Sequence, residues 1–166
     1  MSKDEIREIA EIVGGDSTYR RFVKRINKEF QNADEKRNSN VYVLFIETSK
    51  GKRIGFSVIG KSPAKMRIWQ KTFKEEGWVS GRFKMAKEAF ELMYMYVKPI
   101  YRSKGYGEKL FQRTIDYGRK RKVKEVYAYV GDTNPESLDF YKRMKAEIIS
   151  DLSDEEATAA FLRWKI

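Results

Sequence analysis

The sequence predicts an α/β (α+β) fold in which helices flank a sheet. Two kinds of segment alternate along its 166 residues: apolar residues at helical spacing, and short β-branched or aromatic runs that end at turn residues. One aromatic run, Leu92–Val97, leads through Pro99 into a turn with two glycines and then into a helical segment. With 41% hydrophobic and 14% aromatic residues, the chain suits a single domain, residues 1–166.

The expected elements follow from periodicity, caps and turn residues. Gly14-Gly15 ends the first helix, Asp16 or Ser17 caps the second, and Ser49–Lys52 is the turn of a hairpin. In chain order we expect helices over 3–13 and about 16–30, strands over 41–48 and 53–60, a helix over 63–76, a strand over 92–97, a helix from 105 to about 122, a strand over 123–130, a helix from 135, and strands over 146–150 and 161–166.

The stretch after the hairpin is the least regular. Pro63 at a first helical position and Gly77 as a stop predict one helix here, whereas residues 78–90 fit a helix and a strand equally. The large aromatics of this stretch either line a substrate pocket or pack the segment onto the domain. They are Trp69, Trp78 and Phe83.

Several chemistries are excluded by composition. The chain has no cysteine and no histidine, which removes disulfides, thiolate nucleophiles, histidine bases and the usual zinc ligands. We therefore expect no metal centre, and acid–base chemistry must use carboxylates, tyrosines, lysines or water. No apolar run is long enough to span a bilayer and the start has no signal-peptide character, so we expect a cytoplasmic protein without a membrane partner.

The net charge of +11 has two interpretations. One is attraction to anions such as a phosphorylated cofactor or nucleic acid; the other, which we favour, is a solvated surface rich in both signs. The run Arg119–Lys122 has the same two interpretations, because it complements the C-terminal dipole of its helix or forms part of a nucleic-acid patch. Nucleic-acid binding is therefore an alternative that we do not favour.

The turn after the aromatic run predicts an anion site. Gly105 and Gly107 open a helix, whose first turn offers N–H groups and the positive end of its dipole, and glycine lets the backbone approach a ligand closely. Arg102 and Lys104 add two cations. The P-loop pattern is absent, and the dinucleotide pattern fails at its third glycine, where Leu110 stands. We expect a phosphorylated cofactor here.

Two blocks of sequence narrow the choice. The first is R-x-x-G-x-G after a V-x-P strand end, here Val97–Pro99 followed by Arg102–Gly107. It resembles motif A of the GCN5-related N-acetyltransferase (GNAT) family, whose loop binds the pyrophosphate of acetyl-CoA. The second block, Asn134–Tyr141, resembles the family's N-x-x-[A/S]-x-x-[L/F]-Y segment. Together the blocks cover about residues 88–146, with room for one helix and one strand between them.

The resemblance implies a fold and a cofactor. The fold is that of the GNAT acyl-CoA N-acyltransferases, a mixed, mostly antiparallel central sheet flanked by helices, in which residues of about 61–87 form an inserted helical segment. The cofactor is acetyl-CoA (CoA), and Asn134 contacts its pantetheine region, caps a helix, or does both. The expected cofactor-binding residues are Met95, Tyr96, Val97, Arg102, Ser103, Lys104, Gly105, Tyr106, Gly107, Asn134 and Tyr141.

The resemblance also implies two catalytic residues. Glu91 begins the central strand, eleven residues before Arg102, where the histone-acetylating branch of the family carries its glutamate base. Alternatively Glu91 faces water at a strand start, and a water chain or Glu88 serves instead. Tyr141 would protonate the leaving thiolate, or is a core aromatic of its helix. The backbone around Met95–Val97 would hold the developing oxyanion.

The expected function is acetyl transfer from acetyl-CoA to a primary amine by direct attack in a ternary complex. The acceptor is a protein lysine, a protein N-terminus or a small amine, and the sequence does not choose among them. The alternative is a non-catalytic CoA-binding module of the same fold, or a basic nucleic-acid-binding one. The oligomeric state stays open, a dimer included.

Overall fold

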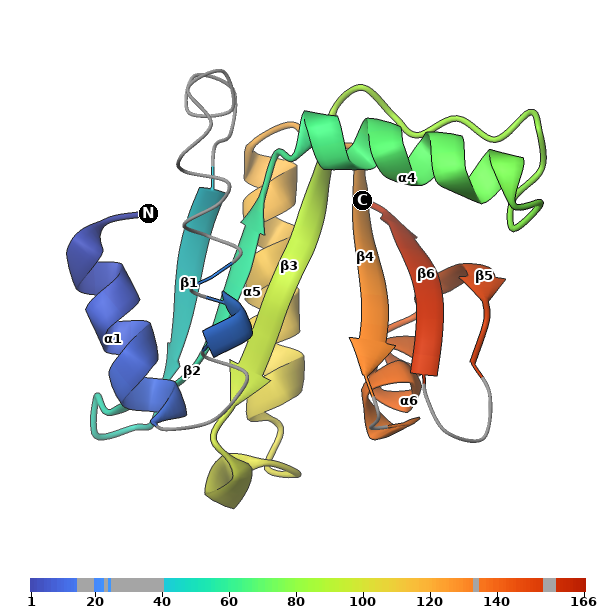
Figure 1. The fold of residues 1–166 in the computed structure, drawn as a ribbon. Helices are drawn as coiled ribbons and strands as arrows, with labels where there is room; N and C mark the ends of the chain where they lie inside the picture. Colours follow the sequence, from blue (N-terminus) through green and yellow to red (C-terminus); the bar gives the residue numbers. More distant parts are fainter. Residues whose placement is uncertain (15–19, 23, 25–40, 133–134, 154–157) are drawn as a thin grey trace. The chain divides into compact units, whose positions relative to one another are not determined.

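The computed structural model describes all residues except 15–19, 23, 25–40, 133–134 and 154–157. Figure 1 shows the arrangement of its helices and strands. In chain order these are α1 (Lys3–Val13), β1 (Val41–Glu47), β2 (Arg53–Gly60), α4 (Pro63–Glu75), β3 (Ala89–Val97), the 3₁₀ turn η1 (Pro99–Tyr101), α5 (Tyr106–Lys120), β4 (Glu125–Asp132), α6 (Pro135–Arg143), β5 (Glu147–Asp151) and β6 (Thr158–Lys165).

Most elements lie where the sequence predicts them. The helix expected over about 16–30 falls largely outside the described residues, although Arg20–Phe22 and Lys24 are helical. Residues 78–88, for which helix and strand were equally expected, form neither. The strand predicted from Leu92 begins earlier, at Ala89.

A six-stranded sheet carries the fold, in the order β1-β2-β3-β4-β6-β5. β3 and β4 pair parallel, whereas β1 with β2, β4 with β6, and β5 with β6 pair antiparallel. This mixed, mostly antiparallel sheet with flanking helices confirms the predicted fold class. The chain divides into two compact units: a first unit of Met1–Lys61 and Leu92–Asp116, and a second unit of Ser62–Glu91 and Tyr117–Ile166.

The first unit is built on the β1–β2 hairpin and on α1. Gly51, with φ of 75°, lies in the hairpin turn. A capping box starts α1: the Ser2 hydroxyl accepts a hydrogen bond from the Glu5 N–H at 3.1 Å, and the Glu5 carboxylate accepts one from the Ser2 N–H. The apolar face of α1 is buried in a cluster that consists of Ile9, Ile12, Val13, Phe22, Val41, Phe56, Val58 and Met93.

A close approach of β2 to β3 fixes the other side of the first unit. A Cβ atom at Gly55 would lie 2.5 Å from the carbonyl oxygen of Tyr96, so only glycine fits there. The Ser57 and Thr114 hydroxyls share a buried hydrogen bond of 2.6 Å that joins β2 to α5. A second apolar cluster of this unit is made of Ile46, Ile54, Val97 and Leu110. Both the end of β3 and the start of α5 are thereby held in place.

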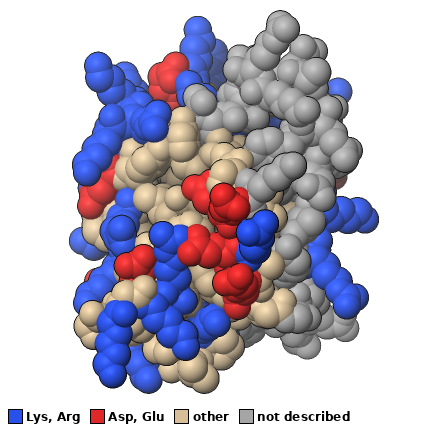
Figure 2. Space-filling model, turned by 90° about the vertical axis from the view of Figure 1, so that its left-hand side faces the viewer, with Lys and Arg blue, Asp and Glu red and all other residues tan. Residues whose placement is uncertain are grey.

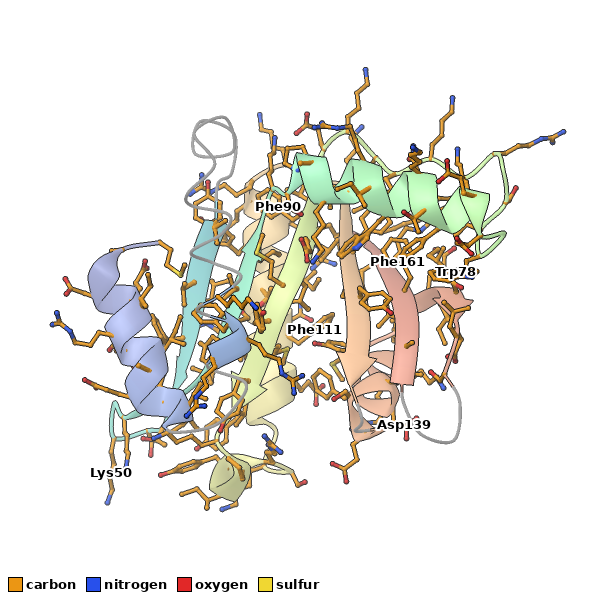
Figure 3. The ribbon with its side chains drawn as sticks, viewed as in Figure 1. Lys50, Trp78, Phe90, Phe111, Asp139 and Phe161 are labelled. Carbon is orange, nitrogen blue, oxygen red and sulfur yellow. The ribbon has the colours of Figure 1, made fainter. Side chains whose placement is uncertain are left out.

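In the second unit, α4 covers an aromatic cluster on β4 and β6. The Phe161 ring lies 4.8 Å from that of Phe73 and 5.5 Å from that of Tyr127. Figure 3 shows Phe161 and Trp78 on the side of α4 that faces the strands. The cluster comprises Met66, Trp69, Phe73, Ala89, Tyr127 and Phe161, with Trp78 and Phe83 packed against it. The aromatics of this segment therefore pack it onto the strands, which is one of the two roles expected of them.

A charged network holds the loop between α4 and β3 on the sheet. Nε and Nη2 of Arg163 donate to the two carboxylate oxygens of Glu147 at 3.0 and 2.6 Å. Nη1 of Arg163 lies 3.6 Å from Glu125. Glu125 also accepts hydrogen bonds from the Tyr127 hydroxyl and from the N–H of Ala86 in the loop. One arginine thus connects β4, β5 and β6 to this loop.

The surface mixes charges of both signs. Figure 2 shows carboxylates among the lysines and arginines on the side that carries α1. Arg53 forms ion pairs with Glu8 and, at 3.1 Å, with Glu47. This agrees with a mixed, solvated surface as the origin of the net charge.

Within the described parts of the chain, no helix is long and apolar enough to cross a membrane, and no three His, Cys, Asp or Glu side chains are grouped to hold a metal ion.

Candidate active site

The glycine loop, residues 98–105, connects β3 to α5 in the first unit (Figure 1). It begins with the single 3₁₀ turn Pro99–Tyr101. The helix starts at Tyr106, and its first backbone hydrogen bond runs from the N–H of Lys109 to the carbonyl of Gly105 at 3.1 Å. A strand end, a turn and a helix N-terminus therefore follow one another in the predicted order, and the first-turn N–H groups of α5 lie beside the loop.

Two residues of the loop have left-handed backbone. Gly105 has φ of 77° and Ser103 has φ of 58°. The conformation of Ser103 costs about 1 kcal/mol, which the surrounding structure must offset. A Cβ atom on Gly105 would meet no atom within 4 Å, so glycine serves the backbone conformation here and the space beside it is open. Open space next to a helix N-terminus suits a bound phosphate.

The loop carries two exposed cations, Arg102 and Lys104. Nε of Arg102 donates to the Val97 carbonyl at 3.0 Å, and its guanidinium carbon lies 5.7 Å from the centre of the Tyr96 ring. β3 thus orients this side chain through a bond that does not use its two terminal amino groups. Nζ of Lys104 lies 5.9 Å from the Tyr101 ring. Two cations and a helix N-terminus together suit an anion such as a pyrophosphate.

Three more of the expected cofactor residues lie on β3 and α5. Met95 and Tyr106 pack against the apolar cluster that buries Val97, and Gly107 is the second residue of α5. Asn134 lies outside the described residues, so both of its expected roles remain predictions.

Glu91, in the second unit, is the third residue of β3 and is only 1% exposed. The predicted strand start at Glu91 is wrong, because the buried apolar residues Ala89 and Phe90 already belong to the strand. The β-sheet register sets Glu91 opposite Tyr127 of β4. Glu91 therefore does not face water at a strand end, whereas Glu88, the substitute candidate, is exposed.

The carboxylate of Glu91 has two partners from the start of α4. The Ser62 hydroxyl donates a hydrogen bond to Oε2 at 2.5 Å, and Nζ of Lys65 lies 3.8 Å from Oε1. Sequence reasoning did not find these two residues. The serine before Pro63 resembles an ordinary helix cap, and Lys65 resembles a solvated helix residue. The detectable signal was Glu91 itself, a carboxylate inside an otherwise apolar strand.

Tyr141 lies on α6 of the second unit. Its ring meets the ring of Trp164 edge to face, with centroids 5.5 Å apart. The residue as a whole keeps partial exposure, but desolvation raises the pKa of its phenol above the ordinary value. Tyr141 is therefore protonated at neutral pH, as a proton or hydrogen-bond donor must be. The catalytic role stays a prediction.

The fold and the glycine loop define an α/β protein with a glycine-containing turn between a strand and a helix N-terminus. The chain belongs to the acetyltransferase (GNAT) family, whose family model matches residues 6–145. The resemblance in the two sequence blocks is thereby confirmed at the level of the family.

One curated relative and two solved structures show the extent of the similarity. The protein named "Uncharacterized N-acetyltransferase MJ1207", from Methanocaldococcus jannaschii, is 34% identical over 70 residues, which is 42% of this chain and 30% of that protein. The ribosomal-protein-S18-alanine N-acetyltransferase of Escherichia coli has a TM-score of 0.62 at 13% identity, over 100% of this chain and 90% of the other. The PaiA N-acetyltransferase of Thermoplasma acidophilum, solved with coenzyme A, has a TM-score of 0.53 at 17% identity, over 100% and 80%. At these identities the two structures show a shared fold.

Proposed function

We propose that this protein transfers the acetyl group of acetyl-CoA to a primary amine, by direct attack of the amine in a ternary complex. Membership of the acetyltransferase family supports acetyl-CoA as the donor, and a structure of the same fold contains coenzyme A. The observation that carries the proposal is the glycine loop. Its exposed Arg102 and Lys104, its open left-handed Gly105 and the start of α5 suit a pyrophosphate.

Residues of the first unit, together with Asn134, are the proposed binding site of the donor, acetyl-CoA. The glycine loop and the first-turn N–H groups of α5 hold the pyrophosphate. The backbone of Met95–Val97 binds the pantetheine arm and stabilises negative charge on the carbonyl oxygen. Acetyl-CoA supplies an activated acetyl group on a thioester.

Glu91 is the proposed general base. A lysine-like amine has a pKa near 10.4, so its deprotonation at pH 7 costs about 4–5 kcal/mol. The Glu91 carboxylate takes this proton directly or through water, and the neutral nitrogen attacks. The new C–N bond forms at the carbonyl carbon and the C–S bond breaks, so that CoA leaves as a thiolate. The nitrogen then loses its second proton to solvent, which leaves a neutral amide.

Tyr141 is the proposed donor to the leaving sulfur. Because burial raises the pKa of Tyr141, the phenol keeps its proton at neutral pH and presents it to the developing thiolate. Complete transfer to a thiolate with a pKa of about 8.5 would run uphill from such a phenol. Stabilisation through a charge-assisted hydrogen bond is therefore its main contribution, and solvent completes the protonation.

Titration calorimetry with acetyl-CoA tests the donor, with desulfo-CoA and ADP as controls. We expect saturable one-to-one binding that requires the pantetheine arm. Binding that ADP reproduces would reduce the loop to a general phosphate site. Acetyl transfer is then assayed with a peptide that has a free N-terminus and one lysine, and with spermidine as a small amine. Mass spectrometry of the products identifies the acceptor class.

Nucleic-acid binding is the second candidate, and the exposed run Arg119–Lys122 at the end of α5 is its only support in the described structure. The guanidinium of Arg121 already bonds the Tyr117 hydroxyl at 2.8 Å and lies over its ring. The helix dipole accounts for the remaining cations. Salt-sensitive RNA binding that persists at saturating acetyl-CoA would favour this candidate.

A further inference from the structure

The first turn of α4 holds the Glu91 carboxylate from two sides. Ser62 donates to one carboxylate oxygen at 2.5 Å, which is the short distance of a charge-assisted bond. The ammonium of Lys65 lies 3.8 Å from the other oxygen. Ser62 is 8% exposed and Glu91 1%, whereas the side chain of Lys65 is 37% exposed, so the carboxylate is buried and the ammonium borders the solvent. Each oxygen of the buried carboxylate is thus assigned a partner.

Ser62 departs from the usual behaviour of a serine at a helix start. A serine at the N-cap normally accepts a hydrogen bond from an N–H of the first turn. Ser2 does so in α1, but the side chain of Ser62 makes no capping bond in α4. The backbone carbonyl of Ser62 still accepts from Met66 at 2.9 Å, so the residue occupies the N-cap while its hydroxyl is directed to Glu91.

Lys65 departs from the usual pattern as well. Carboxylates are favoured in the first turn of a helix because the dipole is positive there, and α1 carries Asp4 and Glu5 in that position. The first turn of α4 has no acidic residue and has Lys65 instead. Its ammonium lies 3.8 Å from Glu91 and 4.9 Å from the centre of the Trp69 ring. The buried carboxylate of Glu91 therefore explains both unusual features of this helix start: a serine hydroxyl that makes no capping bond, and a cation in the first turn.

We propose that Ser62 and Lys65 are positioning residues for Glu91, which they hold as an oriented carboxylate for proton abstraction. The hydrogen bond to Oε2 fixes the plane of the carboxylate, and the ammonium beside Oε1 balances its charge. A base held in one orientation keeps its lone pair on the reacting proton, and a misplacement of about 1 Å costs up to about 100-fold in rate. The inference rests on the proposed function, because it needs Glu91 as the base.

A double-mutant cycle on the full chain tests the Ser62 contact. CoA release from acetyl-CoA is followed with a thiol reagent, using the peptide with a free N-terminus and one lysine; the chain has no cysteine, so the protein gives no background. We expect Ser62→Ala to lower kcat about tenfold and leave KM for acetyl-CoA within twofold. Ser62→Thr, which keeps the hydroxyl, should recover most of the rate. In the Glu91→Gln background, Ser62→Ala should change kcat less than twofold.

Lys65 is tested with a matched pair of variants on the same helix. Lys65→Met should lower kcat about tenfold and Lys65→Arg should restore most of it, whereas Lys71→Met removes an exposed surface ion pair and should leave kcat unchanged. Ser2→Ala removes a serine that does cap its helix, and it controls for a general effect of helix destabilisation on kcat.

The outcomes separate this inference from the proposed function. If the wild type releases no CoA with either the peptide or spermidine, or if Glu91→Gln leaves kcat unchanged, the proposed function fails and the inference fails with it. Only the inference is overturned if Glu91→Gln lowers kcat but Ser62→Ala does not. The same holds if Ser62→Ala lowers kcat by the same factor in the wild-type and in the Glu91→Gln background. A second measurement is independent of turnover: the ¹³C carboxyl resonance of Glu91, assigned by its loss in Glu91→Gln, should shift in Ser62→Ala. An unmoved resonance overturns the inference as well.

Discussion

The ring of Tyr141 on α6 meets the ring of Trp164 on β6 edge to face, with their centroids 5.5 Å apart. Trp164 is itself fixed, because its indole N–H donates to the carbonyl of Met144 at 3.0 Å. The Phe140 ring lies 5.3 Å from that of Tyr141 on the same helix. The last strand of the chain therefore sets the direction of the phenol, and it does so through contacts of the ring that do not involve the hydroxyl.

Tyr141→Phe keeps the ring that makes those contacts and removes only the hydroxyl, so it tests the chemical role of that hydroxyl. We expect kcat to fall about 100-fold, in the range that a lost proton or hydrogen-bond donor commonly costs. Affinity for acetyl-CoA and the melting temperature should change little. Steady-state kinetics, calorimetry and thermal unfolding measure the three quantities. Tyr129→Phe, at an exposed tyrosine of the same unit, is the control. An unchanged kcat would show that the Tyr141 hydroxyl does not assist the leaving sulfur.

Alkaline pH should destabilise the protein through its buried phenols. Burial raises the pKa of Tyr141, and burial together with the Glu125 carboxylate raises that of Tyr127. Below pH 10 each phenol is protonated in both the folded and unfolded states. Above it, the unfolded tyrosines lose protons that the folded ones retain, so stability falls as pH rises.

The magnitude of this effect is measurable by urea unfolding between pH 9 and 11.5. One such group contributes at most about 1.4 kcal/mol per pH unit to the slope of unfolding free energy. Tyr141→Phe should therefore make the slope above pH 10 shallower, by up to that amount. Equal slopes for the wild type and the variant would show that this phenol titrates alike in both states.

The fold and the glycine loop were predictable because their signals are local. The run that ends at Val97, the turn glycine Gly105 and the apolar spacing of the next helix lie within a few residues of one another. Such short-range patterns decide where a strand ends and a helix begins. The family model confirms the resemblance that these residues carry.

The surroundings of Glu91 were not predictable, because they depend on contacts between distant parts of the chain. Ser62 lies 29 residues before Glu91, and only the packing of α4 brings its hydroxyl to the carboxylate. The Arg163 pair with Glu147 likewise depends on the register of β5 against β6, in which these two residues are opposite each other. Sequence patterns give the elements, whereas such pairings follow from tertiary packing.

Gly105→Ala tests whether the glycine loop is the cofactor site. A Cβ atom would strain the left-handed backbone, at a cost of about 1 kcal/mol of stability, and would occupy the open space assigned to the pyrophosphate. We expect affinity for acetyl-CoA to fall at least tenfold, which is about 1.4 kcal/mol. Calorimetry gives the affinity and urea unfolding gives the stability.

Gly51→Ala is the matched control for this prediction. Gly51 lies in the same unit, has φ of 75° against 77° for Gly105, and also has no atom within 4 Å of an added Cβ. The control should lose similar stability and retain full affinity for acetyl-CoA. Equal affinity losses in the two variants would mean that strain, and not the loop, controls cofactor binding.

Arg163→Met should clearly destabilise the second unit. The side chains of Arg163 and Glu125 are only 14% and 15% exposed, so the variant leaves a largely buried carboxylate without its cation. Removing one partner of such a pair costs about 3 kcal/mol, or a drop of about 6–12 °C in melting temperature at this chain length.

Glu147→Gln provides the contrast: its side chain is 47% exposed and Arg163 keeps Glu125, so the loss should stay below about 1 kcal/mol. Thermal unfolding of both variants measures the difference, and equal losses would show that the exposed pair with Glu147, and not the buried contact with Glu125, stabilises this side of the sheet.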